Sequence, residues 1–189
     1  FAIPGGYCYI MGGLILAADD EAEVAAVVAH EVNHVTTRHG MRSLQRQVGF
    51  DLLSSALTQE SGQVVKVIQQ AGGLLAMRGF SRYDERQADR LGVEAMYKAG
   101  YDPREAVDFF QSLQEKEMST HPGGQQQNLV GQVQQLFSTH PETAERIDNI
   151  QEQVKTYDLQ GRDLIVSSPE FEQVQEILRQ KISGEVPEL

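Results

Sequence analysis

His30-Glu31-Val32-Asn33-His34 is the stretch of this sequence around which the rest of the chain can be interpreted. It lies in an apolar, periodic segment that predicts an α-helix, and residues four apart on a helix share one face. The two histidines can therefore present ring nitrogens to one metal ion, and Glu31 can reach a water molecule on that ion without binding it. This arrangement is typical of zinc-dependent peptide hydrolysis.

The spacing of apolar residues predicts further helices and one short β element. Asp20 is the expected N-cap of the motif helix, which should run to about Arg38 and stop near Gly40. The segment 7–16 predicts a strand or hairpin with Gly12-Gly13 as its turn or bulge. The remaining expected helices cover 43–58, 63–78, 82–99 (ending at Gly100), 103–117, a segment starting at 139–141 and another starting at 168–169, with a polar loop at 119–128.

Composition restricts the classes of partner. The chain has 189 residues, a formal net charge of −11 and a pI near 4.8, without a basic run, which argues against nucleic acid and anionic lipid as partners. No stretch reaches the roughly eighteen apolar residues of a membrane-spanning helix. The single cysteine, Cys8, cannot form an internal disulfide and is expected to pack as a small apolar residue.

Two histidines leave a zinc site incomplete, so a third ligand has to come from elsewhere in the chain. The metzincin pattern would place Gly and His at the third and sixth positions after His34, but these positions hold Thr37 and Gly40. His39 is one residue short of that pattern. We expect it to interact with carbonyl groups at the end of the helix.

The segment Ser81–Asp89 offers the alternative, a carboxylate from a separate helix. Glu85 and Asp89 are four residues apart, so both can face the motif helix, and the small Ala88 permits a close approach. We predict Glu85 as the third ligand and Asp89 as the acceptor for the second ring nitrogen of a ligand histidine. The competing interpretation is that these acids pair with neighbouring arginines on a solvated surface.

With these residues together, the chain resembles the HtpX and CAAX-prenyl-protease family of zinc metallopeptidases, and most of all its soluble bacterial periplasmic members. The similarity covers most of residues 1–150. It rests on Phe-Ala-Ile-Pro-Gly-Gly-Tyr at 1–7, His-Glu-Val-Asn-His-Val-Thr-Thr-Arg-His at 30–39, Ser-Arg-Tyr-Asp-Glu-Arg-Gln-Ala-Asp at 81–89, and Thr-His-Pro with Arg-Ile at 139–147. The chain begins at Phe1 without an initiator Met, so we expect a longer parent protein in which an export signal or anchor can lie upstream.

The resemblance implies a gluzincin-type, zincin-like fold of the α+β class, predominantly helical, with a small β element near the N-terminus. It implies one Zn²⁺ per chain held by His30, His34 and Glu85, with Glu31 as the general base. It also places His140 and Arg146 near the metal. His140 could stabilise the oxyanion of the tetrahedral intermediate or occupy the open zinc position when no substrate is bound, and these roles predict opposite effects of its removal.

We expect a single metallopeptidase domain over 1–189, with a catalytic core at 1–155 and a C-terminal helical extension at 156–189. The expected substrate is a peptide or unfolded protein, which could pair with an exposed edge strand within 7–16. From the resemblance, the expected location is the bacterial periplasm or cell envelope, with a parent that can be membrane-associated and can have partner proteins. The alternative function is a largely latent peptidase that acts as a chaperone-like binding or assembly factor.

Overall fold

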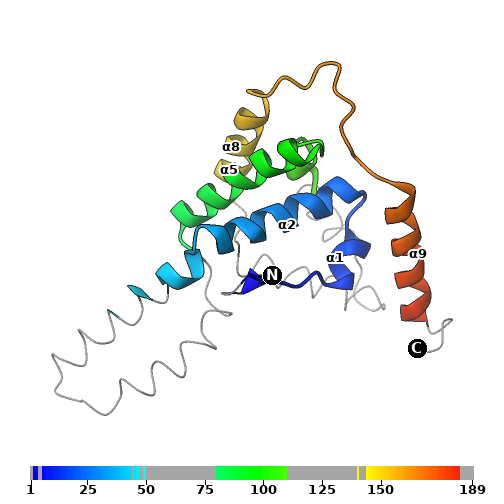
Figure 1. The fold of residues 1–189 in the computed structure, drawn as a ribbon, viewed down its shortest axis with the longest axis horizontal. Helices are drawn as coiled ribbons and strands as arrows, with labels where there is room; N and C mark the ends of the chain where they lie inside the picture. The colour runs from blue at the N-terminus through cyan, green and yellow to red at the C-terminus, as the bar shows by residue number, and fades with distance from the viewer. Residues whose placement is uncertain are drawn as a thin grey trace, which may run out of the picture.

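The computed structural model describes residues 2–3, 6–43, 45–46, 49, 80–109, 140 and 144–183. Within these ranges the chain is mostly helical with one small antiparallel β pair, as predicted (Figure 1). The helix expected at 63–78 and the loop at 119–128 lie outside the described residues, as do most of the helix expected at 43–58 and the second half of that expected at 103–117. No helix in the described ranges is long and apolar enough to cross a membrane.

The motif helix is α2 (Glu21–Thr36), and its N-terminus is capped as predicted. The Asp20 side chain accepts a hydrogen bond from the Glu23 backbone N–H at 2.9 Å, and the Glu23 side chain accepts one from the Asp19 N–H at 2.7 Å. The first bond satisfies a donor that a helix start leaves without a partner, and the second fixes the residue before the cap. The predicted stop at Gly40 is wrong: the helix breaks at Arg38, which has a φ of 56°, and residues 39–43 are helical again.

The predicted strand over 7–16 is wrong beyond its first two residues. Strands β1 (Ala2–Ile3) and β2 (Tyr7–Cys8) pair antiparallel, and α1 (Gly12–Ala17) follows. Leu14 and Ala18 are buried in one core cluster and Ala17 packs against it; a helix places all three on one face, whereas a strand would turn Ala17 to the opposite face. Cys8 is exposed rather than packed, because both residues of β2 face solvent.

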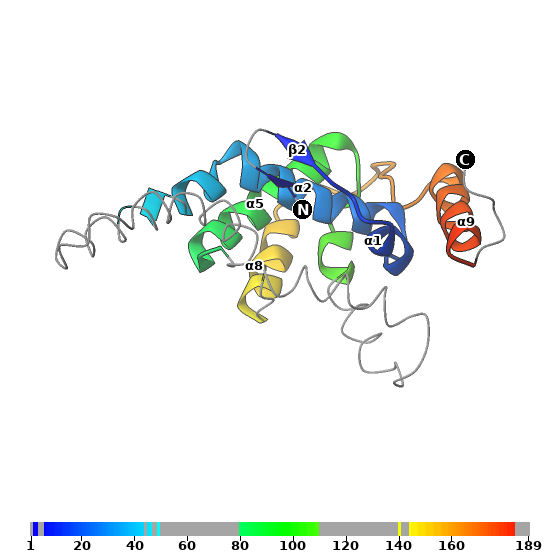
Figure 2. The same cartoon turned by 90° about the horizontal axis from the view of Figure 1, so that it is seen from below.

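Helices α2 and α5 (Arg82–Ala99) lie side by side in both views (Figures 1 and 2). Ser81 caps the start of α5 by accepting the Asp84 backbone N–H at 3.2 Å, and Gly100 ends it with a left-handed φ of 90°, as predicted. Ala88 is fully buried, and a Cβ at Gly92 would lie 3.3 Å from the His30 backbone nitrogen. Small residues therefore allow α5 to approach α2 closely at the motif.

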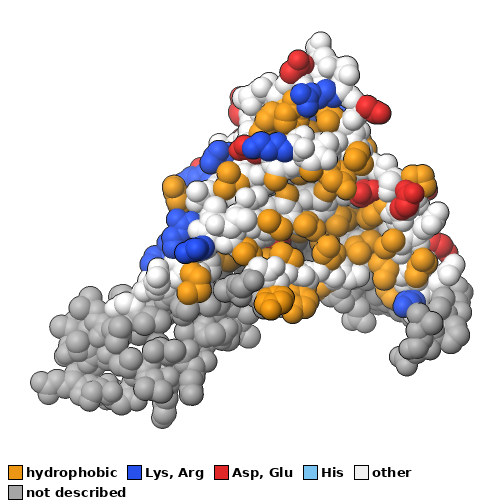
Figure 3. Space-filling view, viewed as in Figure 1, with side chains coloured by type: hydrophobic (Ala, Val, Ile, Leu, Met, Phe, Trp, Pro, Cys, Tyr) orange, Lys and Arg blue, Asp and Glu red, His pale blue; other side chains and the backbone are white. Residues whose placement is uncertain are grey.

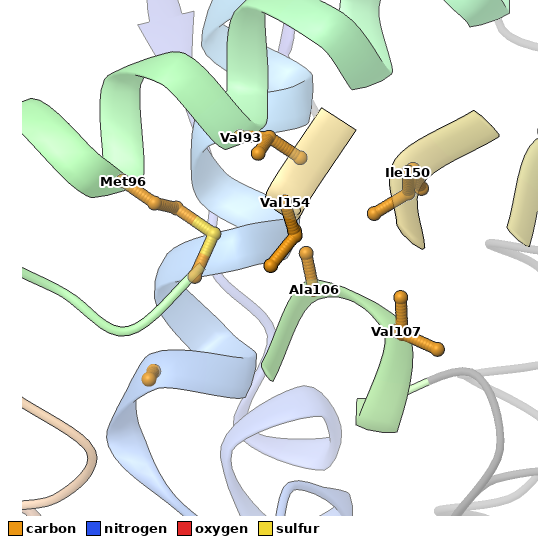
Figure 4. Close-up of a cluster of buried hydrophobic side chains, with 7 residues drawn as sticks. Val93, Met96, Ala106, Val107, Ile150 and Val154 are labelled. Carbon is orange, nitrogen blue, oxygen red and sulfur yellow. The ribbon is translucent and has the colours of Figure 1, made fainter. Parts of the chain in front are cut away.

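Helix α8 (Ala144–Val154) completes the core on the other side of α5. Its apolar face packs with residues of α2, α5 and the segment 101–109 in one cluster (Figure 4). The buried members of that cluster are Ala22, Val93, Met96, Ala106, Val107, Ile150 and Val154. This packing fixes the relative positions of the helices that carry the polar residues described below.

The last helix, α9 (Pro169–Ser183), packs against α1 at the other end of the molecule. It begins where predicted, at Ser168-Pro169. Ser168 caps it by accepting the Phe171 N–H at 3.2 Å, and its hydroxyl also donates to Glu21 at the start of α2. Gln175 donates to the carbonyl groups of Ile15 at 2.8 Å and Ala18 at 2.9 Å. Apolar side chains gather on the surface where α1, α2 and α9 meet (Figure 3).

Candidate metal centre

Helix α2 brings His30 and His34 together on its face toward α5. Their Nε2 atoms lie 2.9 Å apart, and both side chains are largely or fully buried. The spacing of one helical turn, predicted from the sequence, explains this convergence. Both imidazoles therefore direct the same ring atom into one small volume.

Helix α5 supplies the carboxylates from the opposite side. Glu85 Oε2 lies 3.4 Å from His30 Nε2, and Glu85 Oε1 lies 3.6 Å from His34 Nε2. Asp89 Oδ1 lies 2.9 Å from His30 Nδ1, the ring atom that faces away from the cluster. The solvated-surface interpretation of these acids is wrong, since Glu85 is 3% and Asp89 7% exposed.

His140 joins the same cluster from the segment before α8. Its Nδ1 lies 3.0 Å from Glu85 Oε1 and 3.2 Å from His30 Nε2. Its Nε2 faces Glu31 Oε1 at 3.3 Å. His140 is buried and therefore occupies the space beside both the histidine pair and the carboxylate of Glu31.

Arg146 of α8 binds the two α5 carboxylates from behind. Its Nε and Nη2 donate to the two oxygens of Asp89 at 2.8 and 2.7 Å, a bidentate geometry. Its Nη1 forms an ion pair with Glu85 Oε2 at 3.1 Å and donates to the His140 carbonyl oxygen at 3.4 Å. The sequence-predicted Arg146 thus links Asp89, Glu85 and the His140 segment.

Glu31 differs from the other acids because it faces the cluster without entering it. Its Oε2 accepts a hydrogen bond from the Ala2 backbone N–H of β1 at 3.1 Å. Its Oε1 is buried and accepts no hydrogen bond within the described residues, although His140 Nε2 is near. This leaves one carboxylate oxygen beside the ring nitrogens that could accept a proton.

The donor set fits a zinc ion. One ligand atom from each of His30, His34, Glu85 and His140 lies within 4.8 Å of the other three. Tetrahedral zinc with bonds of about 2.0–2.1 Å to nitrogen requires ligand atoms roughly 3.3 Å apart, close to the separations above. The buried carboxylates of Glu31, Glu85 and Asp89 and the buried guanidinium of Arg146 together leave two negative charges for a divalent cation to balance.

Without a cation, this excess of negative charge acts on the histidines. Burial opposes protonation of His30, but hydrogen bonds and charges from Asp89 and Glu85 prevail and raise its pKa to about 9. Burial, followed by the charge on His30, lowers the pKa of His34 to about 2. Protonated His30 can then donate Nδ1–H to Asp89 and Nε2–H to uncharged His34. Burial opposes the charge on Asp89, but the Arg146 guanidinium and His30 hold its pKa below the usual range.

Two residues beside the centre were not identified from the sequence. His39 is fully buried and lies with its Nδ1 3.0 Å from His34 Nδ1, so the expectation of a helix-end residue bonding to carbonyl groups is wrong. The Phe80 ring lies over His34, with 3.9 Å between the ring centroids. A histidine so soon after His34 could have drawn attention to His39. Nothing in the sequence, however, indicated the helix break at Arg38 that turns His39 inward. Phe80, just before the Ser81 cap, had no signal.

Behind His30 and Asp89 lies a small cavity of about 30 Å³. Its wall is mainly apolar and includes Ala26, Val27, Val93, Met96, Phe109 and Ile150, with Arg146 at one side. The side chains of Arg146 and Asp89 are each 7% exposed, and this burial strengthens their electrostatic attraction.

Comparison with known proteins extends the sequence-derived resemblance. Residues 1–154 match the sequence model of peptidase family M48. The putative beta-barrel assembly-enhancing protease of Vibrio cholerae is 30% identical over 167 residues, covering 83% of this chain and 32% of that protein. The beta-barrel assembly-enhancing protease of Escherichia coli is 27% identical over 181 residues, covering 90% of this chain and 34% of the relative.

A eukaryotic relative shows the same similarity. The mitochondrial metalloendopeptidase OMA1 of Schizosaccharomyces pombe is 32% identical over 155 residues, covering 80% of this chain and 42% of that protein. The chain spans about a third of the length of the bacterial relatives it matches.

Proposed function

This chain belongs to peptidase family M48 and is a metallopeptidase, and on this premise we propose that it is a zinc endopeptidase whose metal is held by His30, His34 and Glu85. The observation that carries the proposal is the convergence of their ligand atoms from two antiparallel helices, α2 and α5. Zinc bound there would supply Lewis acidity, polarising the scissile carbonyl and lowering the pKa of the attacking water.

Glu31 is the proposed general base. It lies next to His30 on α2, and its Oε1 faces the cluster without a hydrogen bond from the described residues. It would accept the proton of the attacking water and pass it to the leaving amine. The Ala2 N–H at 3.1 Å holds the other oxygen and so sets the orientation of the carboxylate.

His140 is proposed as a fourth group at the metal when no substrate is bound. Its Nδ1 lies 3.0 Å from Glu85 Oε1 and 3.2 Å from His30 Nε2, and Glu85 and His30 are themselves 3.4 Å apart. These similar separations support the role of a metal ligand over that of an oxyanion donor. A substrate carbonyl would then have to displace the His140 ring. The proposed support for the ligands comes from Asp89, which accepts from His30, and Arg146, which pairs with Asp89.

The substrates we propose are extended segments of unfolded or misassembled proteins. The sequence suggested 7–16 as the edge to which a peptide would add, but α1 occupies the second half of that segment. The strand next to α2 is β1, and its Ala2 N–H points toward Glu31 rather than toward β2. We therefore place the peptide along β1, where backbone pairing gives affinity with little sequence preference.

We also propose that the protein works in the bacterial cell envelope, because its bacterial relatives are named for β-barrel assembly. We further propose that the protein acts there together with partner proteins. The alternative of a mostly latent peptidase that works as a binding factor is not favoured, since relatives from bacteria and mitochondria are both named as peptidases.

The test is peptide cleavage by the zinc-loaded chain and by Glu31→Gln, with metal content measured on both. We expect zinc to bind equally to the two proteins while the variant loses about 10²- to 10⁴-fold in kcat, the range for removal of a general base. Chelation should abolish cleavage by the parent chain, and added zinc should restore it. Full cleavage by Glu31→Gln, or cleavage that persists without metal, would contradict the proposal.

A further inference from the structure

The two histidines of α2 have different partners behind them. A histidine that offers Nε2 to a metal carries its proton on Nδ1, and that N–H needs an acceptor that fixes the tautomer and the ring orientation. For His30 this acceptor is the carboxylate of Asp89, at 2.9 Å. For His34 the group at this position is another imidazole, that of His39, with 3.0 Å between the two Nδ1 atoms.

A contact between two Nδ1 atoms is favourable only when one carries a proton and the other a lone pair. The other end of His39 shows which of the two is protonated. His39 Nε2 lies 3.0 Å from Gln87 Oε1, and Asp84 Oδ1 lies 3.6 Å from the same nitrogen. Both oxygens are acceptors, so His39 carries its proton on Nε2 and presents a lone pair at Nδ1.

The orientation of the Gln87 amide is itself fixed by an arginine. Arg42 Nη2 lies 3.3 Å from Gln87 Oε1, and a guanidinium can only donate. The amide oxygen rather than the amide nitrogen must therefore face both Arg42 and His39. Arg42 also pairs with the buried Asp84 at 3.7 Å, which keeps its side chain on this side of α5.

We propose that Arg42, Gln87 and His39 form a hydrogen-bond relay that holds His34 in the Nδ1–H tautomer and aims its Nε2 at the metal. His39 is thus a positioning residue, as are the two groups behind it. The part of the inference that concerns the metal rests on the proposed function. The tautomer of His34 does not, because it is a property of the metal-free protein. The relay depends on the left-handed Arg38, after which the chain turns and His39 lies against His34.

The test compares three substitutions of His39 in the full chain. Asn places an amide oxygen near the position of Nδ1 and keeps an acceptor for His34. Gln places its polar group near the position of Nε2 and keeps only the bond to Gln87, whereas Leu keeps neither. Zinc dissociation constants are measured by competition with a chelator, and folding is measured by thermal unfolding without metal.

We expect His39→Gln and His39→Leu to weaken zinc binding about 10- to 100-fold, the usual effect of losing such a partner, and His39→Asn to stay within about threefold of the parent. A residue that only filled space would not distinguish Asn from Gln. Equal losses for Asn and Gln would overturn the proposal. Gln87→Met should also weaken zinc binding, whereas Gln153→Met, a matched change on α8, should not.

Nitrogen-15 NMR of the zinc-free chain provides a second readout that does not depend on metal or on folding of a variant. We expect His34 to show the Nδ1–H tautomer and His39 the Nε2–H tautomer. The opposite assignment would overturn the relay. If the parent chain binds no zinc at all, the proposed function fails, while the tautomers still decide the relay independently.

Discussion

Arg146 is a buried guanidinium, 6% exposed, that contacts two carboxylates and a backbone carbonyl of the site. Removing it would leave Asp89 and Glu85 buried without the guanidinium that pairs with both of them. We expect Arg146→Met to cost about 3–5 kcal/mol in the free energy of unfolding of the metal-free protein, the range for breaking one side of a buried ion pair. Denaturant unfolding measures this directly.

The matched control is Arg86→Met on the neighbouring helix. Arg86 pairs with Glu145 at 2.7 Å, but both side chains are about half exposed, so the loss should be below about 1 kcal/mol. Equal losses for the two variants would show that Arg146 does not stabilise the buried carboxylates.

His140 provides a prediction whose sign distinguishes two roles. If its ring occupies the fourth position at the metal, as we propose, His140→Ala should increase cleavage of a short peptide severalfold while weakening zinc retention. The physical reason is that substrate no longer has to displace a ligand. Steady-state kinetics and chelator competition measure the two effects. A large fall in kcat with unchanged zinc affinity would assign His140 to the oxyanion instead.

At the scale of residues, the sequence indicated which side chains meet in the structure. Helical spacing alone places His30 and His34 on one face of α2, and Glu85 and Asp89 on one face of α5. It could not indicate His39 in the same way. Its position depends on the positive φ of Arg38, a conformation that few non-glycine residues adopt and that no neighbouring residue signals.

Among the elements, the close contact of α2 and α5 at Gly92 governs the geometry of the centre. A Cβ there would lie 3.3 Å from the His30 backbone nitrogen and 3.4 Å from its Cα. We expect Gly92→Val to move α5 away from α2, which separates Glu85 and Asp89 from His30 and lowers zinc affinity at least tenfold, since a displacement of about 1 Å disrupts such sites. Chelator competition checks this result.

The control for general destabilisation is Gly100→Ala at the end of the same helix. Its φ of 90° makes alanine unfavourable by about 1–2 kcal/mol, but nothing lies within 4 Å of the added Cβ. This variant should therefore melt earlier and still bind zinc normally. Normal zinc affinity in Gly92→Val would refute the role of the contact.

The helix ends at Asp20 and Gly100 could be predicted because capping is local chemistry, and the starts near 82 and 168 were predicted from the sequence pattern. The segment 7–16 could not, since its β-branched and aromatic residues also suit a strand. Burial of Leu14 against α2 and the 105–109 segment decides in favour of a helix, and that contact involves residues distant in the sequence.

At the scale of the whole molecule, the C-terminal residues are attached to the first helices rather than separate from them. Asp102 and Ala22 donate backbone hydrogen bonds to the carbonyl groups of Ile165 and Val166, both at 2.9 Å. Residues 1–154 match the family, yet Gln175 and Ser168 bond to α1 and α2. We therefore propose that residues 156–183 stabilise the catalytic core as part of one domain.

Within this acidic chain of net charge −11, one group of carboxylates lies around Glu105, close to Asp20 at the start of α2. Burial of Glu105, followed by the negative charges of Asp20, Asp108 and Asp102, raises the pKa of Glu105 to about 7 from an ordinary 4.5. Between pH 4.5 and pH 7 the folded protein binds more protons than the unfolded chain. The free energy of unfolding therefore falls as the pH rises through this window.

Glu105→Gln removes the titrating group and keeps its shape. We expect the free energy of unfolding to be nearly unchanged at pH 5 and about 1 kcal/mol higher at pH 8, after allowance for partial solvent screening. Denaturant unfolding of the metal-free protein at the two pH values measures the difference. Asp148→Asn, which removes an exposed charge on α8, is the control for the change in net charge. An equal gain at both pH values for Glu105→Gln would mean that the carboxylate is ionised throughout, and that burial at the start of α2 does not control its protonation.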